Sequence, residues 1–150
     1  MPHSYLSNLM HCVFSTKERR KFITPELQQR LWPFIGGIAR ENGMKASAVG
    51  GVADHIHVLL SLPAPMPVAK AMQLVKGGSS KFVHETFSDQ RDFAWQEGYG
   101  AFSVSISHVE ETVAYIQKQA EHHRRRTFEE EFRAFLQKHG IEHDERQVWG

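Results

Sequence analysis

Short segments in which apolar residues either run together or alternate with polar ones predict four β-strands. The first covers residues 9–14, and the second covers 44–52 and contains a Gly50-Gly51 pair that predicts a turn. Residues 55–62 follow as a third strand and 102–106 as a fourth. Alternate apolar residues of the third strand should share one face of the sheet. The second and third strands are adjacent in sequence and therefore predict a hairpin.

Other segments space their apolar residues three and four positions apart, as amphipathic helices do. The first predicted helix begins at Thr24-Pro25, an N-cap residue followed by a proline, and ends near Asn42-Gly43. A second helix is predicted over residues 68–86, although Gly77-Gly78 weakens its centre. A third begins near Ser107, and residues 128–139 predict a last helix.

The predicted order is β-α-β-β-α-β followed by further helices. This order is typical of a ferredoxin-like (RRM-like) α/β fold, in which two helices pack on one face of an antiparallel sheet. The chain has 150 residues and is 41% hydrophobic, enough to bury one core. We therefore expect a single domain over residues 1–150.

Composition narrows the class of protein only slightly. A net charge of +1 neither requires nor excludes a polyanionic partner. The lone Cys12 cannot form an internal disulfide, and the N-terminal residues do not resemble a secretory leader. No stretch approaches the roughly 18 apolar residues of a membrane span. We expect a soluble, cytoplasmic protein.

The first candidate for chemistry is the His55-Ile56-His57 segment in the third predicted strand. Residues two apart in a strand point to the same face, so both imidazoles are aligned as metal ligands while Ile56 faces the core. Histidine pairs also arise by chance, as packed or surface residues. A metal site therefore requires a third ligand from elsewhere in the chain.

Tyr115 and Gln119 are the second candidate, because they are four residues apart in a predicted helix. Side chains at this spacing are neighbours on one helix face, which would bring a hydroxyl nucleophile close to an amide-oxygen ligand. Taken alone, the tyrosine is more typical of a core or interface aromatic and the glutamine of a solvated helix position. Their combination with the histidine pair favours a catalytic site.

Five ordered segments give the chain a resemblance to a known family. They are residues 13–17 (VFSTK), 54–59 (DHIHVL), 76–81 (KGGSSK), 95–105 (WQEGYGAFSVS) and 115–123 (YIQKQAEHH). Together they resemble the single-tyrosine HUH transposases of the smallest bacterial insertion sequences, the insertion-sequence 200 class. Relatives of that class associated with repetitive extragenic palindromes (REP) share the pattern.

The resemblance implies an activity and a set of site residues. His55, His57 and Gln119 correspond to the ligands of a divalent ion, usually Mg²⁺ or Mn²⁺, and Tyr115 corresponds to the nucleophile. A transposase of this kind cleaves and rejoins single-stranded DNA next to a hairpin through a 5′-phosphotyrosine intermediate. Two histidines would also suit zinc, so ligand type alone does not fix the metal.

Resemblance further implies a homodimer. In dimeric relatives the tyrosine helix of one subunit can complete the metal site of the other. Assembly of the site within one chain and assembly between two chains are both open from the sequence.

Basic residues near these segments are candidates for contact with DNA phosphates. Lys17, Arg19 and Arg20 follow the first strand, Lys76 and Lys81 flank a Gly-Gly-Ser-Ser segment, and Arg124 extends the tyrosine helix. The alternative for each residue alone is an ordinary solvated charge. As a group they favour phosphate binding.

Three other functions compete with a transposase. A domesticated nuclease would process palindromic repeats instead of moving its own element. A non-catalytic module would bind single-stranded nucleic acid on its sheet, with the histidines incidental. A metal- or histidine-dependent phosphoesterase would act on small nucleotides, but it leaves the tyrosine helix and the basic residues unexplained.

Overall fold

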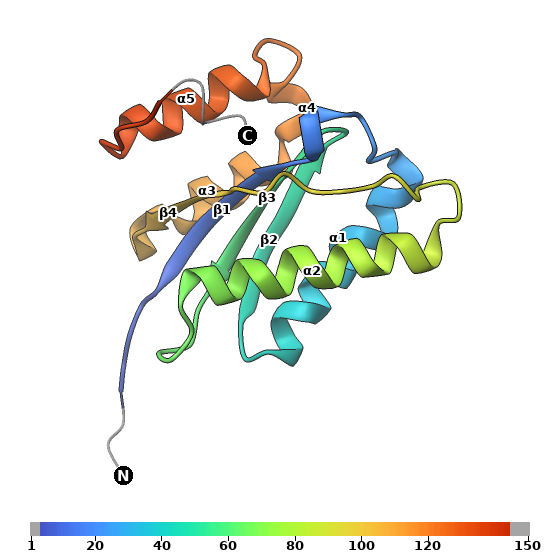
Figure 1. Ribbon diagram of the computed structural model, residues 1–150. Coiled ribbons are helices and arrows are strands. Elements are labelled where there is room, and N and C mark those ends of the chain that lie inside the picture. Colours follow the sequence, from blue (N-terminus) through green and yellow to red (C-terminus); the bar gives the residue numbers. More distant parts are fainter. Residues whose placement is uncertain (1–3, 145–150) are drawn as a thin grey trace.

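A computed structural model of the chain, which describes residues 4–144, has a four-stranded antiparallel sheet at its centre (Figure 1). The strands are β1 (Leu9–Ser15), β2 (Lys45–Val52), β3 (His55–Ser61) and β4 (Gly100–Val104), in the order β2-β3-β1-β4. A short 3-10 helix, η1 (Lys17–Arg19), follows β1. This order confirms the predicted ferredoxin-like fold.

Helices α1 (Pro25–Glu41) and α2 (Val68–Thr86) cover one face of the sheet, as Figure 1 shows, and enclose the main core. The predicted N-cap of α1 is confirmed, because the Thr24 side chain accepts a hydrogen bond from the Leu27 amide. Helix α2 runs unbroken through Gly77-Gly78. A Cβ on Gly78 would lie 2.8 Å from Ile38 Cδ1, so this glycine allows the two helices to approach closely.

The opposite face carries the C-terminal helices: η2 (Ile106–His108), α3 (Val109–Gln117), α4 (Gln119–His122) and α5 (Phe128–Lys138) (Figure 1). Helix α3 packs against Ala48 and Leu59 through Ile116. Helix α5 begins with a capping box at Thr127 and docks on Val13 and Phe102 of the sheet through three apolar side chains, Phe128, Phe132 and Leu136.

Three predicted boundaries were wrong. The β2–β3 turn is formed by Ala53 and Asp54, whereas Gly50 and Gly51 are paired with β3 inside the strand. A Cβ on Gly50 would lie 2.2 Å from the Ile116 carbonyl oxygen, so glycine here serves the packing of α3 and not a turn. The fourth strand covers residues 100–104 instead of 102–106. The predicted tyrosine helix is interrupted at Lys118.

No helix within residues 4–144 is both long and apolar enough to cross a membrane.

Candidate metal and nucleophile site

The histidine pair lies on β3, an inner strand of the sheet between β2 and β1, and both rings are completely buried. His55 and His57 point to the face that carries α3, α4 and α5, while Ile56 and Val58 enter the core against α1 and α2. The predicted alternation along this strand is therefore confirmed. The sheet holds both imidazoles in one orientation.

Gln119 meets this pair from α4. Its Oε1 atom lies 3.1 Å from Nε2 of His55 and 3.1 Å from Nε2 of His123. The helix break at Lys118 does not separate Gln119 from Tyr115, because the glutamine Nε2 donates to the Tyr115 carbonyl oxygen at 3.3 Å. The structure thus brings together the three residues predicted as metal ligands.

A fourth donor, the carboxylate of Glu131, comes from α5 and was not predicted. Glu131 is 1% exposed, and its Oε1 atom lies 3.0 Å from Nε2 of His57, 3.2 Å from Nε2 of His123 and 3.5 Å from Nε2 of His55. One signal could have revealed it: Glu131 stands beside Phe128 and Phe132 on the apolar face of an amphipathic helix. An acid at such a position needs buried partners.

Two further groups hold the outer nitrogens of the histidine pair. Asp54 Oδ1 lies 2.8 Å from Nδ1 of His55, and His11 Nε2 lies 2.7 Å from Nδ1 of His57. Metal-binding histidines commonly use their other ring nitrogen in this way, which fixes the ring and directs Nε2 toward the ion. No spacing in the sequence links His11 to the pair. Strand pairing does so, because Val13 of β1 lies opposite His57 and His11 is two residues before Val13 on the same face.

The buried charges at the site are mutually stabilised. Burial raises the pKa of Glu131, but hydrogen bonds from His123, His55 and His57 outweigh it and hold the pKa well below its usual range. Burial lowers the pKa of His55, but its bonds to Asp54 and Glu131 raise it to about 9. Burial dominates at His57, whose pKa is lowered. The cluster therefore keeps a buried carboxylate beside an imidazolium.

The donors fit a divalent cation. Ligand atoms of His55, His57 and Glu131 all lie within 4.8 Å of one another, and several of the contacts around them are close to 3 Å. Adjacent ligands of an octahedral ion with bonds of about 2.1 Å are also about 3 Å apart. Imidazole nitrogens with a carboxylate suit several divalent metals, so the donor set does not select one.

Tyr115 lies beside these ligands in the same chain, on α3. Its hydroxyl donates a hydrogen bond to Oε2 of Glu131, and its ring centre lies 4.6 Å from that of the tilted His122 ring. Burial, together with the Glu131 charge, raises the pKa of Tyr115 above its usual value. The hydroxyl is thus a neutral phenol next to the carboxylate that also contacts His57.

The basic residues predicted to contact DNA divide into two groups. Arg19 pairs with Glu129 of α5 at 3.0 Å, and the Arg20 guanidinium lies 5.4 Å from the centre of the Phe22 ring. Lys17 and Arg124 are exposed. Arg124 approaches the site: it lines a cavity that also contains Asp54 and His123, together with three basic residues that were not predicted, Lys21, Arg125 and Arg126.

Lys76 and Lys81 instead lie on α2, on the opposite face of the sheet from the histidine pair. Lys76 Nζ donates to the carbonyl oxygens of Gln96, Glu97 and Gly98 at 2.7–3.0 Å. This side chain therefore fixes the segment before β4. Lys81 is exposed and 3.9 Å from Glu85. The structure does not bring either lysine to the site.

The fold and the site can be compared with those of known proteins. Solved structures with a similar fold include a Deinococcus radiodurans protein assigned as a transposase, with a TM-score of 0.65 and 22% identity over 79% of this chain and 96% of that one. Another is a REP-associated tyrosine transposase bound to a REP hairpin, with a TM-score of 0.55 and 16% identity over 77% and 68% of the two chains. The fold is thus one that transposases use.

Proteins with similar sequences are also transposases. The transposase of insertion sequence IS200 from Salmonella typhimurium is 30% identical over 66% of this chain and 68% of its own length. The ISDra2 transposase TnpA of D. radiodurans is 26% identical over 74% and 80%. Residues 4–119 match the family described as "Transposase IS200 like". The chain belongs to the IS200-like transposase family.

Proposed function

We propose that this transposase cleaves single-stranded DNA next to a hairpin and rejoins it through a covalent 5′-phosphotyrosine on Tyr115. The observation that carries the proposal is the convergence of the Tyr115 hydroxyl with His57 on one buried carboxylate, that of Glu131. A nucleophile and a cation site that share a ligand can act on the same phosphate. Single-stranded specificity and hairpin recognition rest on the family resemblance.

The residues proposed to hold Mg²⁺ or Mn²⁺ are His55, His57, Gln119 and Glu131. A divalent ion bound there would stabilise negative charge that develops on the oxygens of the scissile phosphate. Asp54 and His11 would keep the two imidazoles in register by holding their Nδ1 atoms. The buried setting strengthens each of these electrostatic interactions because water is excluded.

In the proposed cleavage step, the Tyr115 oxygen forms a bond to phosphorus as the bond from phosphorus to the 3′-oxygen breaks. The phenol must lose its proton as it attacks, and Oε2 of Glu131 already accepts its hydrogen bond. The leaving 3′-oxygen takes up a proton and departs as a hydroxyl. Attack by another 3′-hydroxyl on the phosphotyrosine reverses these changes and joins a new strand.

We infer that the site is assembled within one chain. Support comes from the described chain, in which Tyr115 and Gln119 already contact groups around its own His55 and His57. The homodimer implied by resemblance would then serve recognition of the hairpin. Mixing Tyr115→Phe protein with His57→Ala protein tests this inference, since neither should form an adduct alone or together. Recovery of the adduct in the mixture would show assembly between chains.

The function itself is tested by incubating the protein with end-labelled single-stranded oligonucleotides from its flanking DNA, with and without Mn²⁺. The expected product is a metal-dependent protein–DNA adduct that survives denaturant, and Tyr115→Phe should abolish it. Absence of any adduct despite tight hairpin binding would favour the non-catalytic binding module. Cleavage without a covalent intermediate would favour a phosphoesterase.

A domesticated nuclease that processes palindromic repeats is the second candidate. The specific observation in its favour is the fold similarity to the REP-associated transposase bound to a REP hairpin. Both functions use the same chemistry at Tyr115. Mapping the chain's own flanking DNA distinguishes them, because an autonomous element carries its ends beside the gene and a domesticated enzyme acts at dispersed repeats.

A further inference from the structure

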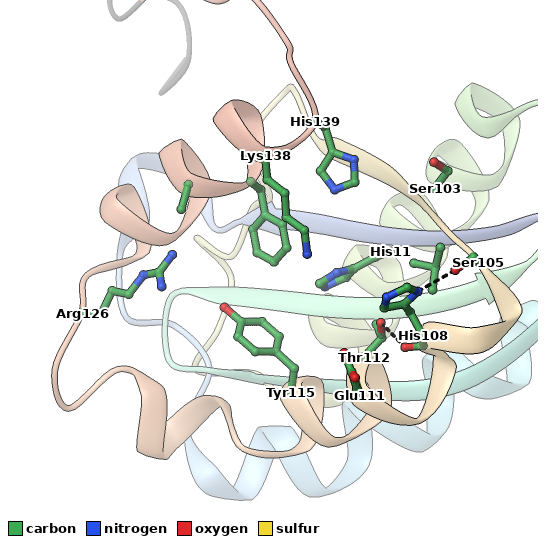
Figure 2. A pocket seen from close by; sticks show the side chains of 13 residues that line it. His11, Ser103, Ser105, His108, Glu111, Thr112, Tyr115, Arg126, Lys138 and His139 are labelled. Atoms are coloured by element: carbon green, nitrogen blue, oxygen red, sulfur yellow. Dashed lines mark hydrogen bonds between the residues drawn. The ribbon is translucent and has the colours of Figure 1, made fainter.

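Two cavities flank the buried ligands, and each is open to the surface. The first, which we call the α3–α5 cavity, has a volume of about 640 Å³ and lies between α3, the end of β4 and α5. Figure 2 shows Tyr115 and Thr112 on one side of it and Lys138 and His139 on the other. The second, which we call the arginine cavity, has a volume of about 510 Å³. Both volumes lie within the range of ligand pockets, about 300–1,000 Å³.

The α3–α5 cavity has the chemistry of a nucleotide site. Lys138 and Arg126 bring positive charge to its wall, and Glu111 is the one carboxylate that residues 4–144 contribute to the lining. Phe135 offers an aromatic ring against which a base can pack, and the Ser103 hydroxyl can donate to a base or sugar. The Thr112 hydroxyl donates to the His108 carbonyl oxygen at 2.9 Å and can accept a hydrogen bond from a base. An unpaired nucleotide presents a negative phosphate, a flat base and polar edges, which match these three kinds of group.

The arginine cavity is more strongly basic and less apolar. It is lined by Lys21 and by the consecutive residues Arg124, Arg125 and Arg126. Asp54 and His123 are also in its wall, so it borders the ligand cluster on the side of the His55 outer partner. Arg126 lines both cavities. A single strand that entered one cavity could therefore continue into the other past the ligand cluster.

The stereochemistry of cleavage assigns one strand to each cavity. In phosphoryl transfer the attacking and leaving oxygens lie roughly in line on opposite sides of phosphorus. Tyr115 lines the α3–α5 cavity and not the arginine cavity, so the leaving 3′-oxygen must depart toward the other side. The nucleoside that stays on the phosphate through its 5′-oxygen is not subject to this in-line requirement and can remain beside Tyr115.

We propose that the α3–α5 cavity holds the nucleoside that becomes attached to Tyr115 through its 5′-phosphate, and that the arginine cavity holds the strand ending in the released 3′-hydroxyl. The proposal rests on the proposed function and adds the polarity of the DNA across the site. It also gives the segment after Phe128 a role in binding substrate. The two cavities are then subsites of one single-strand path.

The test uses two probes on Tyr115→Phe protein with Mn²⁺, so that binding is measured without cleavage. One probe is a degenerate hexanucleotide with a 5′-phosphate and the other is the same mixture with a 3′-phosphate, each labelled at its far end for fluorescence anisotropy. Lys138→Ala should weaken binding of the 5′-phosphorylated probe by about five- to tenfold and leave the other unchanged. Arg124→Ala should have the reciprocal effect.

Ala134→Trp supplies a second variant, because Ala134 lines the α3–α5 cavity from α5 and a large side chain there would fill it. It should reduce binding of the 5′-phosphorylated probe more than tenfold. The matched control is Lys70→Ala, an exposed lysine on α2, which should affect neither probe. Thermal melting checks that each variant is folded.

Equal weakening of both probes, a reversed preference, or no measurable binding of the 5′-phosphorylated probe would each overturn the assignment of strands. The proposed function fails separately, by loss of the Tyr115 adduct in otherwise unaltered protein. If the protein forms the adduct but the variants affect both probes equally, the proposed function stands and the proposed polarity of the DNA strand is refuted.

Discussion

Replacing Glu131 by glutamine is the sharpest test of the metal site, because this residue was found only in the structure. The substitution keeps the size and both polar atoms of the side chain and removes its charge. Glu131 is 1% exposed and contacts Nε2 of both His57 and His123. We expect the variant to bind Mn²⁺ more weakly while its fold is retained.

The magnitude follows from two opposing terms. Two unit charges about 4 Å apart interact by about 4 kcal/mol at an effective dielectric constant of about 20. Part of this is offset, because without metal the carboxylate already accepts bonds from His57, His123 and Tyr115 that the ion would replace. A net loss of about 1.5–3 kcal/mol corresponds to a rise in Kd of about ten- to 150-fold.

Titration of free Mn²⁺ by electron paramagnetic resonance measures this Kd without DNA and without activity. Glu130→Gln is the matched control: Glu130 is adjacent in α5 and exposed, and glutamine preserves its capping box with Thr127. The control should bind Mn²⁺ as the parent does. An unchanged Kd in Glu131→Gln would refute its role as a ligand.

Two further predictions test the packing of the sheet. Gly50→Ala should destabilise the protein by more than about 2 kcal/mol in urea unfolding, because the added Cβ would clash with the Ile116 backbone. Gly77→Ala should instead stabilise it by about 0.5–1 kcal/mol, because Gly77 is exposed in α2 and its Cβ would have nothing within 4 Å. Burial raises the pKa of Cys12 from 9.0 to about 12. The thiol should therefore resist disulfide reagents in native protein at pH 8. Because the thiol of the unfolded chain ionises at lower pH, Cys12 should contribute its full share to the free energy of unfolding below about pH 9 and progressively less up to about pH 12. Unfolding measured across this range should show that loss in the parent and not in Cys12→Ala.

The parts of the site that could be predicted from the sequence are those set by local periodicity. His55 and His57 alternate with core residues along one strand, and this geometry is independent of the rest of the fold. Tyr115 and Gln119 were expected to meet through regular helix spacing. They do approach each other, but across a helix break at Lys118, where Gln119 bonds to the tyrosine carbonyl.

The missed residues are those that reach the site through tertiary contacts. His11 comes from β1, and its link to His57 depends on the pairing of two strands 46 residues apart. Glu131 depends on how α5 docks, which no local pattern specifies. Lys76 is the converse case: its neighbouring glycines favoured a phosphate contact, and in the structure its ammonium group donates to carbonyl groups of the segment before β4.

The docking of α5 is itself informative about function. Burying a carboxylate costs several kcal/mol unless it is fully paired, and an apolar residue at the position of Glu131 would pack against the sheet without that cost. Phe128 and Phe132 on either side show that apolar packing is available to this helix. The carboxylate is instead surrounded by imidazole groups and the Tyr115 hydroxyl. Its stability there depends on the same groups that chemistry on a phosphate would use, so α5 belongs to the site and not only to the fold.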